Sequence, residues 1–352
     1  MGKTYMDVSR YCGMEELKLN LEFVTPCFLG GADSKRAELR ASSFKGMIRY
    51  WWRVLYGAKY GNKILEKENE IFGSASDETS HASNVRIEVS NISENACEIT
   101  GFPKGKKIDV THNGRKRQIN ILDYLAYGKY EYVKGPGNQY TASHIKAGTK
   151  FSLKIACKKE YAEEIFNAVY ALIEYGGIGS RCRNGFGSMR FIESSRKDIS
   201  EKIQNIKMLD SNSPSGFSAF SCKTKSFRTK ENKFSFWEEA LSEIGIVYKK
   251  ARESLEAKHN FDKRGLLARP IVVKNENIPK EIKEGRHPKP VFIHINKNDE
   301  NKYEGKLLLL PISFYEKTKA TDYSTVIQKF AANIASNSNV TETTGELQGG
   351  SK

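Results

Sequence analysis

The 352-residue sequence lacks the long apolar segments that mark membrane proteins and secreted precursors. No apolar run approaches the roughly 20 residues that a membrane-spanning helix needs. The first ten residues, Met1 to Arg10, contain no apolar signal core. These absences predict a cytoplasmic protein that has no membrane partner.

Metal and catalytic signatures are also missing. Zinc sites need convergent pairs of ligands, but the cysteines here are scattered, without a CxxC pair or a histidine at ligand spacing. The prediction is reduced, mostly buried thiols for Cys12, Cys27, Cys97, Cys157, Cys182 and Cys222. No pair of histidines suits acid–base cleavage of RNA, and no cluster of Asp and Glu suits a two-metal nuclease. We expect no enzyme activity, no metal and no cofactor.

The residues that are present describe a globular, basic protein. Hydrophobic residues make up 39% and charged residues 28%, and the length suits two domains, each with its own core. The formal net charge is +15 and is unevenly placed: residues 1–100 hold 13 basic and 14 acidic residues, whereas residues 101–150 hold 10 and 3. This favours a polyanionic partner such as RNA, DNA or an anionic membrane, and a solvated lysine-rich surface is the alternative.

The first half of the chain shows a strand and helix order that predicts a ferredoxin-like domain. Ser42 and Ser43 are good N-cap residues, and the apolar positions that follow them recur at helical spacing. The predicted elements are a strand Leu17–Val24, a helix over 44–55, strands Val85–Val89 and Phe151–Ile155, a helix from Tyr161 and a strand Met189–Ile192. This order is βαββαβ.

The plan recurs more weakly after a polar linker at 210–215. The elements predicted there are a strand Gly216–Cys222, a helix Phe236–Leu255, strands Val291–Ile295 and Lys306–Leu310, and a helix Thr325–Ile334. A fourth strand is not evident, so the second domain is predicted to be degenerate. The fold class is therefore α+β, with two ferredoxin-like (RRM-like) domains at 1–200 and 201–340 and a polar tail at 341–352.

A basic stripe accompanies the apolar stripe of the first helix. Lys45, Arg49 and Arg53 are four residues apart and share one helix face, and Arg36 and Arg40 lie in the loop that precedes it. Together they predict a basic surface that contacts RNA. Trp51 and Trp52 fall on the apolar stripe, so we expect them in the core first and as base-stacking platforms second.

The segment GGIGSRCRNGFG, residues 176–187, is the sharpest motif of the sequence. It follows a helix and enters a strand, the reverse of a Rossmann fingerprint, and it lacks the Gly-Lys-Ser/Thr of a P-loop. Its glycines and arginines can bring backbone N–H groups and guanidinium forks to a phosphate chain. A mobile surface loop is the alternative interpretation.

The segment 101–150 interleaves cations with aromatic residues, as in proteins that bind single-stranded RNA. A disordered or subunit-facing loop is the alternative. Across the chain, the candidate RNA-contacting residues are Arg36, Arg40, Lys45, Arg49, Arg53, Lys106, Lys107, Arg115, Arg117, Gly179, Arg181, Arg183 and Gly185.

Three stretches together carry a family resemblance: Thr25 to Arg53, Gly176 to Gly187, and RHPKPVFIHI at 286–295. They resemble the RAMP superfamily of CRISPR systems and, within it, the first-numbered subunit of the type III-B (Cmr) effector. The resemblance implies two ferredoxin-like domains in a subunit that grips RNA without cutting it, near the 3′ end of the guide RNA. The implied partners are guide RNA, target RNA and the other Cmr subunits.

Two other functions stay open. One is a metal-independent endoribonuclease that processes CRISPR transcripts. The other is a protein-binding cap whose basic charge only aids assembly.

Overall fold

The computed structural model describes residues 13–33, 35–75, 80–98, 102–112, 115–194, 217–231, 233–257, 259–271, 273, 277–314 and 316–344. In its first half, a four-stranded antiparallel sheet has the order β10-β1-β9-β2. Its elements are β1 (Met14–Phe23), α2 (Ala41–Tyr60), α3 (Ile64–Phe72), β2 (Val85–Ser90), β9 (Lys150–Lys158), α5 (Lys159–Tyr175) and β10 (Met189–Ser194). Every strand and helix predicted for this half is confirmed, and α3, after a 3-10 turn at Gly61–Lys63, is additional.

The second half forms another antiparallel sheet, with the order β12-β13-β11-β14. Its elements are β11 (Lys225–Thr229), α7 (Trp237–Glu253), α8 (Asp262–Leu267), α9 (Lys280–Glu284), β12 (Val291–Lys297), β13 (Tyr303–Leu309), a 3-10 turn (Lys317–Lys319), α10 (Ala320–Ala335) and β14 (Val340–Glu342). The two sheets share one arrangement. In each, the first strand lies between the third and the fourth, and the second strand is at the edge.

Three predictions about the second half and the first helix are wrong. The first strand is Lys225–Thr229 and not Gly216–Cys222, because its pairing partners come from residues near 306–309 and 340–342 rather than from local pattern. The fourth strand exists as β14, so the tail does not begin at 341, and Thr343 and Thr344 are buried. Helix α2 begins at Ala41, and its N-cap residue is Arg40, without a side-chain cap.

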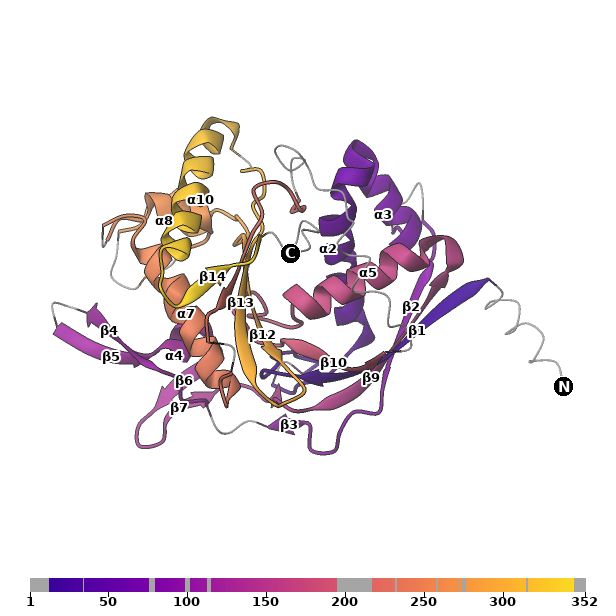
Figure 1. The fold of residues 1–352 in the computed structure, drawn as a ribbon, viewed down its shortest axis with the longest axis horizontal. Helices are drawn as coiled ribbons and strands as arrows, with labels where there is room; N and C mark the ends of the chain where they lie inside the picture. Colours follow the sequence, from indigo (N-terminus) through magenta and orange to yellow (C-terminus); the bar gives the residue numbers. More distant parts are fainter. Residues whose placement is uncertain are drawn as a thin grey trace.

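The segment between β2 and β9 forms small elements of its own. They are β3 (Cys97–Glu98), β4 (Lys107–His112), β5 (Arg115–Asn120), α4 (Ile121–Leu125), β6 (Tyr130–Val133), β7 (Gly137–Tyr140) and β8 (His144–Ile145). The hairpins β4–β5 and β6–β7 project beside α7, at the far end from α2 and α3 (Figure 1). The described part of the 101–150 segment is therefore an ordered layer on the second half.

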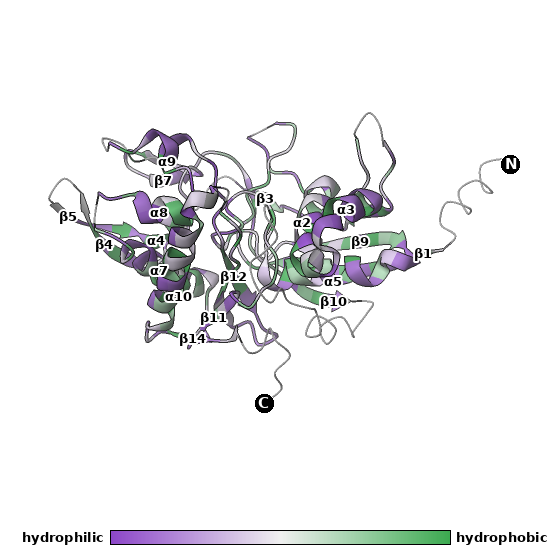
Figure 2. Cartoon of the chain, turned by 90° about the horizontal axis from the view of Figure 1, so that it is seen from above, coloured by the Kyte–Doolittle hydropathy of each residue, from purple (hydrophilic) through white to green (hydrophobic). Residues whose placement is uncertain are grey.

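Each half has its own hydrophobic cluster, and each cluster includes residues of the other half. Sheet β12-β13-β11-β14 stands between α7 and α10 on one side and α2 and α5 on the other (Figure 1). Its residue Phe292 packs against Trp51 of α2 at 5.3 Å between ring centroids. In return, Leu122 and Leu125 of α4 pack into the cluster around α7. The two clusters meet where each half covers a face of the other. Figure 2 shows the hydrophobic colour on β9 and β12 of the two sheets.

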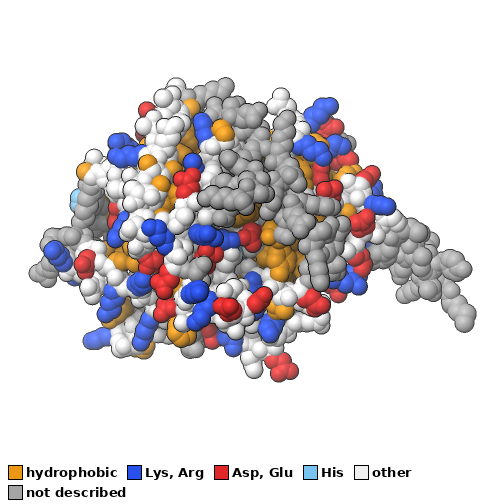
Figure 3. All heavy atoms as spheres, viewed as in Figure 1, with side chains coloured by type: hydrophobic (Ala, Val, Ile, Leu, Met, Phe, Trp, Pro, Cys, Tyr) orange, Lys and Arg blue, Asp and Glu red, His pale blue; other side chains and the backbone are white. Residues whose placement is uncertain are grey.

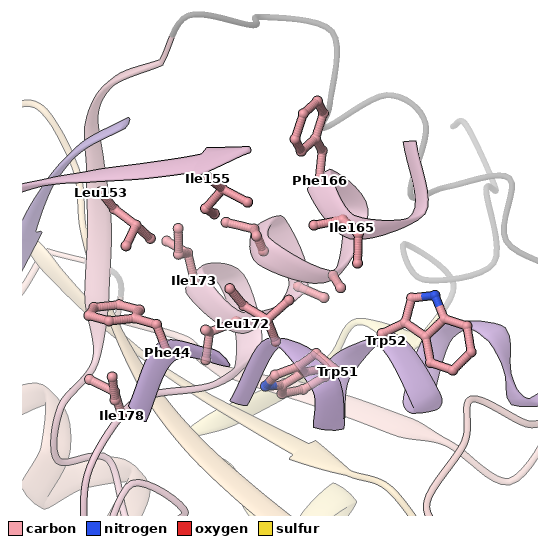
Figure 4. Packing of buried hydrophobic residues seen from close by; sticks show 14 of the residues in the cluster. Phe44, Trp51, Trp52, Leu153, Ile155, Ile165, Phe166, Leu172, Ile173 and Ile178 are labelled. Carbon is pink, nitrogen blue, oxygen red and sulfur yellow. The ribbon is translucent and has the colours of Figure 1, made fainter. Parts of the chain in front are cut away.

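Trp51 and Trp52 are both fully buried, which confirms their predicted place in the core. Trp51 and Phe44 of α2 lie beside Leu172 and Ile173 of α5 (Figure 4). The indole N–H of Trp52 donates to Glu164 at 2.9 Å. Neither ring is available to stack on a base.

Candidate nucleic-acid interface

The glycine-rich loop, residues 176–187, runs from the end of α5 to the start of β10, as the motif predicted. The segment after β1 holds it in place: Gly187 N–H donates to Pro26 O at 2.8 Å, and Ser180 N–H donates to Phe28 O at 2.8 Å. The hydroxyl of Thr25, which is buried, donates to Gly185 O at 2.7 Å. The loop is therefore held to the segment after β1 by hydrogen bonds.

The two glycines named as candidates are required by packing within the protein. Gly179 has φ of +88°, and a Cβ there would lie 2.7 Å from Phe28 O. Gly185 has φ of +89°, and a Cβ there would lie 2.5 Å from a methyl carbon of Leu241 in α7. A side chain at either site would need a left-handed backbone and would displace a neighbour.

Arg181 and Arg183 of this loop have opposite surroundings. Arg181 is exposed and has φ of +63°, an uncommon conformation for a residue other than glycine. Arg183 is partly buried, its guanidinium lying 4.6 Å from the ring centroid of Phe292 and 5.5 Å from that of Tyr50. It also donates to the carbonyl oxygen of Lys289. Arg183 therefore joins the loop to the second half, and RNA contact by Arg183 stays a prediction.

Two of the three residues of the basic stripe on α2 form ion pairs within the protein. Arg49 and Arg53 both form ion pairs with Glu68, a fully buried carboxylate on α3. Helix α3 belongs to a segment that no motif constrained, so no signal in the sequence pointed to this partner. Arg49 and Arg53 thus neutralise a buried charge, and RNA contact by these two partly exposed side chains stays a prediction. Lys45 does not share this pairing with Glu68, and burial together with Arg49 lowers its pKa.

The loop before α2 keeps its predicted cations at the surface. Arg40 is exposed and donates to Gly30 O at 2.9 Å. Arg36 is exposed and lies 3.6 Å from a carboxylate oxygen of Asp33, a surface ion pair that costs little to break. Both remain available to a phosphate chain.

The cations of the 101–150 segment divide between the hairpin and α7. Lys107 and Arg117 are exposed on the β4–β5 hairpin. Arg115 is the first residue of β5, and its backbone lies opposite that of His112 in the strand ladder. Lys106 differs, since its ammonium forms an ion pair with Glu243 of α7. The exposed aromatic side chains near this layer are those of Tyr127 and Tyr132, at 68% and 75% exposure.

These candidates do not form a single continuous patch. The hairpin lies at the far end from α2 in Figure 1, and the glycine loop packs between the two halves. On the face shown in Figure 3, lysines and arginines alternate with Asp and Glu. The sequence did not single out Lys129, Arg252 or Lys289, which the tertiary structure brings to the glycine loop. Only the position of Lys289 within the third motif could have indicated it.

The histidines do not form an accessible catalytic pair among the described side chains. The His144 imidazole lies 3.2 Å from Glu98, but His144 is only 1% exposed. Burial lowers the pKa of both His287 and His294 to about 4. No group of three or more potential metal ligands occurs among the residues described.

The described cysteines are free thiols, as predicted, but only in part buried. Cys27 and Cys157 are buried, Cys182 is intermediate, and Cys97 and Cys222 are exposed. The prediction of mostly buried thiols is therefore wrong for two of these five positions, and Cys12 lies outside the described residues.

Comparison with known proteins finds a family model that matches the region holding this loop. Residues 20–190 match the model of the RAMP superfamily. The RAMP region ends just beyond the glycine loop, and its match confirms the family resemblance of the motifs.

Two curated relatives narrow the resemblance to Cmr subunits. CRISPR system Cmr subunit Cmr1-2 of Pyrococcus furiosus is 28% identical over 190 residues, 50% of this chain and 95% of the relative. Cmr1-1 of the same organism is 26% identical over 169 residues, 47% of this chain and 44% of the relative.

Solved structures share the fold beyond the RAMP region. Apo Cmr1 from Pyrococcus furiosus matches with a TM-score of 0.52 and 18% identity, covering 93% of this chain and 98% of that one. A chain of the type III-B Cmr-β complex, bound to cognate target RNA and AMPPnP, matches with a TM-score of 0.53 and 14% identity, covering 90% and 99%. The predicted α+β class is confirmed, with antiparallel sheets.

None of the described helices is both long enough and apolar enough to cross a membrane. The cytoplasmic location stays a prediction.

Proposed function

We propose that this chain is a non-catalytic RNA-binding subunit of a type III-B CRISPR interference complex. It contacts guide RNA near its 3′ end, target RNA, or both, and acts in antiviral defence beside other Cmr subunits. We also propose that both halves, 1–200 and 201–340, are ferredoxin-like domains. The observation that carries the proposal is the 28% identity to Cmr1-2 over 95% of that relative.

The surface chemistry supports RNA as the partner. Arg36, Arg40 and Arg181 present exposed guanidinium groups on loops that the fold holds firmly. Guanidinium groups bind phosphate oxygens in a bidentate manner, and loops anchored on rigid elements are common binding sites. On the face of sheet β10-β1-β9-β2 that carries Asn20, the polar side chains form hydrogen bonds with one another: Asn20 donates to Glu193 and accepts from Ser152. We therefore place the RNA at the loops rather than on this face.

The purified chain, mixed with labelled single-stranded RNA at physiological salt, tests the proposal. We expect binding, no cleavage with magnesium or with EDTA, and a log affinity that falls linearly with log salt. Lack of binding would favour the protein-binding cap.

The contact of the buried His144 with the partly exposed Glu98 is the one observation that favours the endoribonuclease. Specific RNA scission that disappears in the His144→Ala variant would establish that alternative. Retention of scission by His144→Ala would point to a contaminant, which a second purification step would remove.

A further inference from the structure

A cluster of cations lies where the glycine loop meets α7 and the segment before β12. The Lys289 ammonium donates to Arg183 O at 2.8 Å and to the Asn184 side chain, and it lies 4.4 Å from the ring centroid of Tyr248. Arg252 of α7 donates to the hydroxyl of Tyr124 at 3.3 Å. The rings of Tyr124 and Tyr248 are 6.4 Å apart, so both cations rest against one pair of tyrosines.

Two further cations reach the same place, Lys129 from the turn after α4 and Arg181 from the glycine loop. An atom at the Cβ position of Gly128 would lie 3.3 Å from the Arg181 guanidinium, which places that side chain beside Lys129. Asn184, which accepts from Lys289, donates to Leu125 O at 2.7 Å and so ties the loop to α4. Burial, together with Arg183, Arg252 and Arg181, lowers the pKa of Lys289 well below its ordinary value.

Three members of the cluster lack a counterion within the part of the chain that the structure describes. No described carboxylate forms an ion pair with Lys129, Arg181 or Lys289. By contrast, Lys249, on the same helix as Arg252, forms an ion pair with Glu253. Partly buried charges of one sign that lack a counterion raise the free energy of the folded state. An anion bound among them would remove that cost.

We propose that Lys289, Arg252, Arg181 and Lys129 form a phosphate-binding site between the two halves of the molecule. The proposal rests on the RNA-binding function proposed above and names the group of the RNA that is held. A phosphate suits the cluster because guanidinium and ammonium donors converge from different elements on one anion. A terminal phosphate and an internal phosphodiester share this chemistry.

The test compares Lys289→Gln and Arg252→Gln with Lys63→Gln, an exposed lysine beyond the end of α2 that controls for net charge. Affinity is measured by fluorescence anisotropy with one RNA sequence carrying a 3′ hydroxyl, a 3′ phosphate or a 5′ phosphate. We expect the affinity to fall about tenfold or more for the two site variants and less than about twofold for the control. The salt slope should flatten by roughly 0.7 for each phosphate that a site variant no longer binds.

The three RNAs distinguish a terminal phosphate from an internal phosphodiester as the bound group. If a terminal phosphate is bound, only the RNA with that phosphate loses affinity in Lys289→Gln; if a phosphodiester is bound, all three RNAs lose it equally. Lys289→Arg keeps the cation and should bind like the parent, which separates the site from a folding defect. Site variants that bind every RNA like the parent would overturn the proposal.

A second measurement does not depend on RNA binding. Inorganic phosphate should raise the melting temperature of the parent chain and of Lys63→Gln, and should have little effect on Lys289→Gln. A parent that binds phosphate at this site but no RNA would contradict the proposed function while supporting the site. An equal rise in all three chains would contradict the site while leaving RNA binding intact.

Discussion

At the scale of single residues, two arginines of one loop illustrate how surroundings decide a role. Arg181 and Arg183 are separated by one residue and look equivalent in the sequence. The exposed Arg181 has a left-handed backbone, whereas Arg183 stacks on Phe292 and Tyr50. A residue in strained backbone at the surface is typical of functional sites, and a stacked, partly buried arginine is typical of a structural contact.

Arg181→Ala should weaken binding of single-stranded RNA by about tenfold or more, since a charge-assisted hydrogen bond contributes roughly 1.5–3 kcal/mol. Its melting temperature should stay close to that of the parent. Arg183→Ala should instead lower the free energy of unfolding by about 1–3 kcal/mol and change RNA affinity little. Anisotropy and urea melts measure both effects, with the exposed Arg86→Ala on β2 as the control. Equal weakening of RNA binding in both variants would contradict this division.

At the scale of elements, the β4–β5 hairpin offers a face that can be tested by itself. Side chains alternate between the two faces of a strand. In this register Lys107 and Lys116 share one face, while Arg117 lies opposite, on the face of Val110. Ile108 of the latter face packs against the second core, so the lysine face is the one directed away from it.

Lys107→Ser combined with Lys116→Ser should flatten the slope of log RNA affinity against log salt by roughly 0.7 for each phosphate that these lysines neutralise. Arg117→Ser, on the other face, should flatten it less. Stability should change by less than about 0.5 kcal/mol, because these side chains are exposed. A slope that stays the same in both variants would assign the hairpin to a protein partner or to no role in binding.

At the scale of the whole molecule, buried contacts between the halves couple stability to pH. His294 of β12 donates from Nδ1 to Gly176 O at 2.7 Å, beside the glycine loop. Desolvation by burial lowers the pKa of His287 and His294 from 6.5 to about 4 in the folded chain. Between these values the unfolded chain binds more protons than the folded chain, so acid favours unfolding.

The free energy of unfolding should therefore fall as pH drops from about 6.5 to 4, by up to about 1.4 kcal/mol per pH unit for each of these histidines. Urea melts at a series of pH values measure the slope. His294→Gln removes one titrating group, so the slope should become shallower by about half. A slope equal to that of the parent would show that the pKa of His294 is the same in the folded and unfolded chains, contrary to this prediction.

Sequence pattern alone determined most elements of the first half. The apolar stripe that contains Trp51 and Trp52 predicted α2, and the alternation of Leu17, Leu19 and Leu21 predicted β1. The reason is that each of these elements buries one regular face, and the period of that face is written in the local sequence. The motifs likewise indicated the RAMP superfamily, which the match over 20–190 confirmed.

Only the tertiary structure decided which charges are free and where the halves join. Glu68 lies 15 residues or more from its partners Arg49 and Arg53, and β14 pairs with β11 from the far end of the chain. Lys289 meets the glycine loop because β12 and α7 pack against that loop. A cation's role depends on the charges near it in space, and packing between distant segments sets those neighbours, so local pattern carries no record of them.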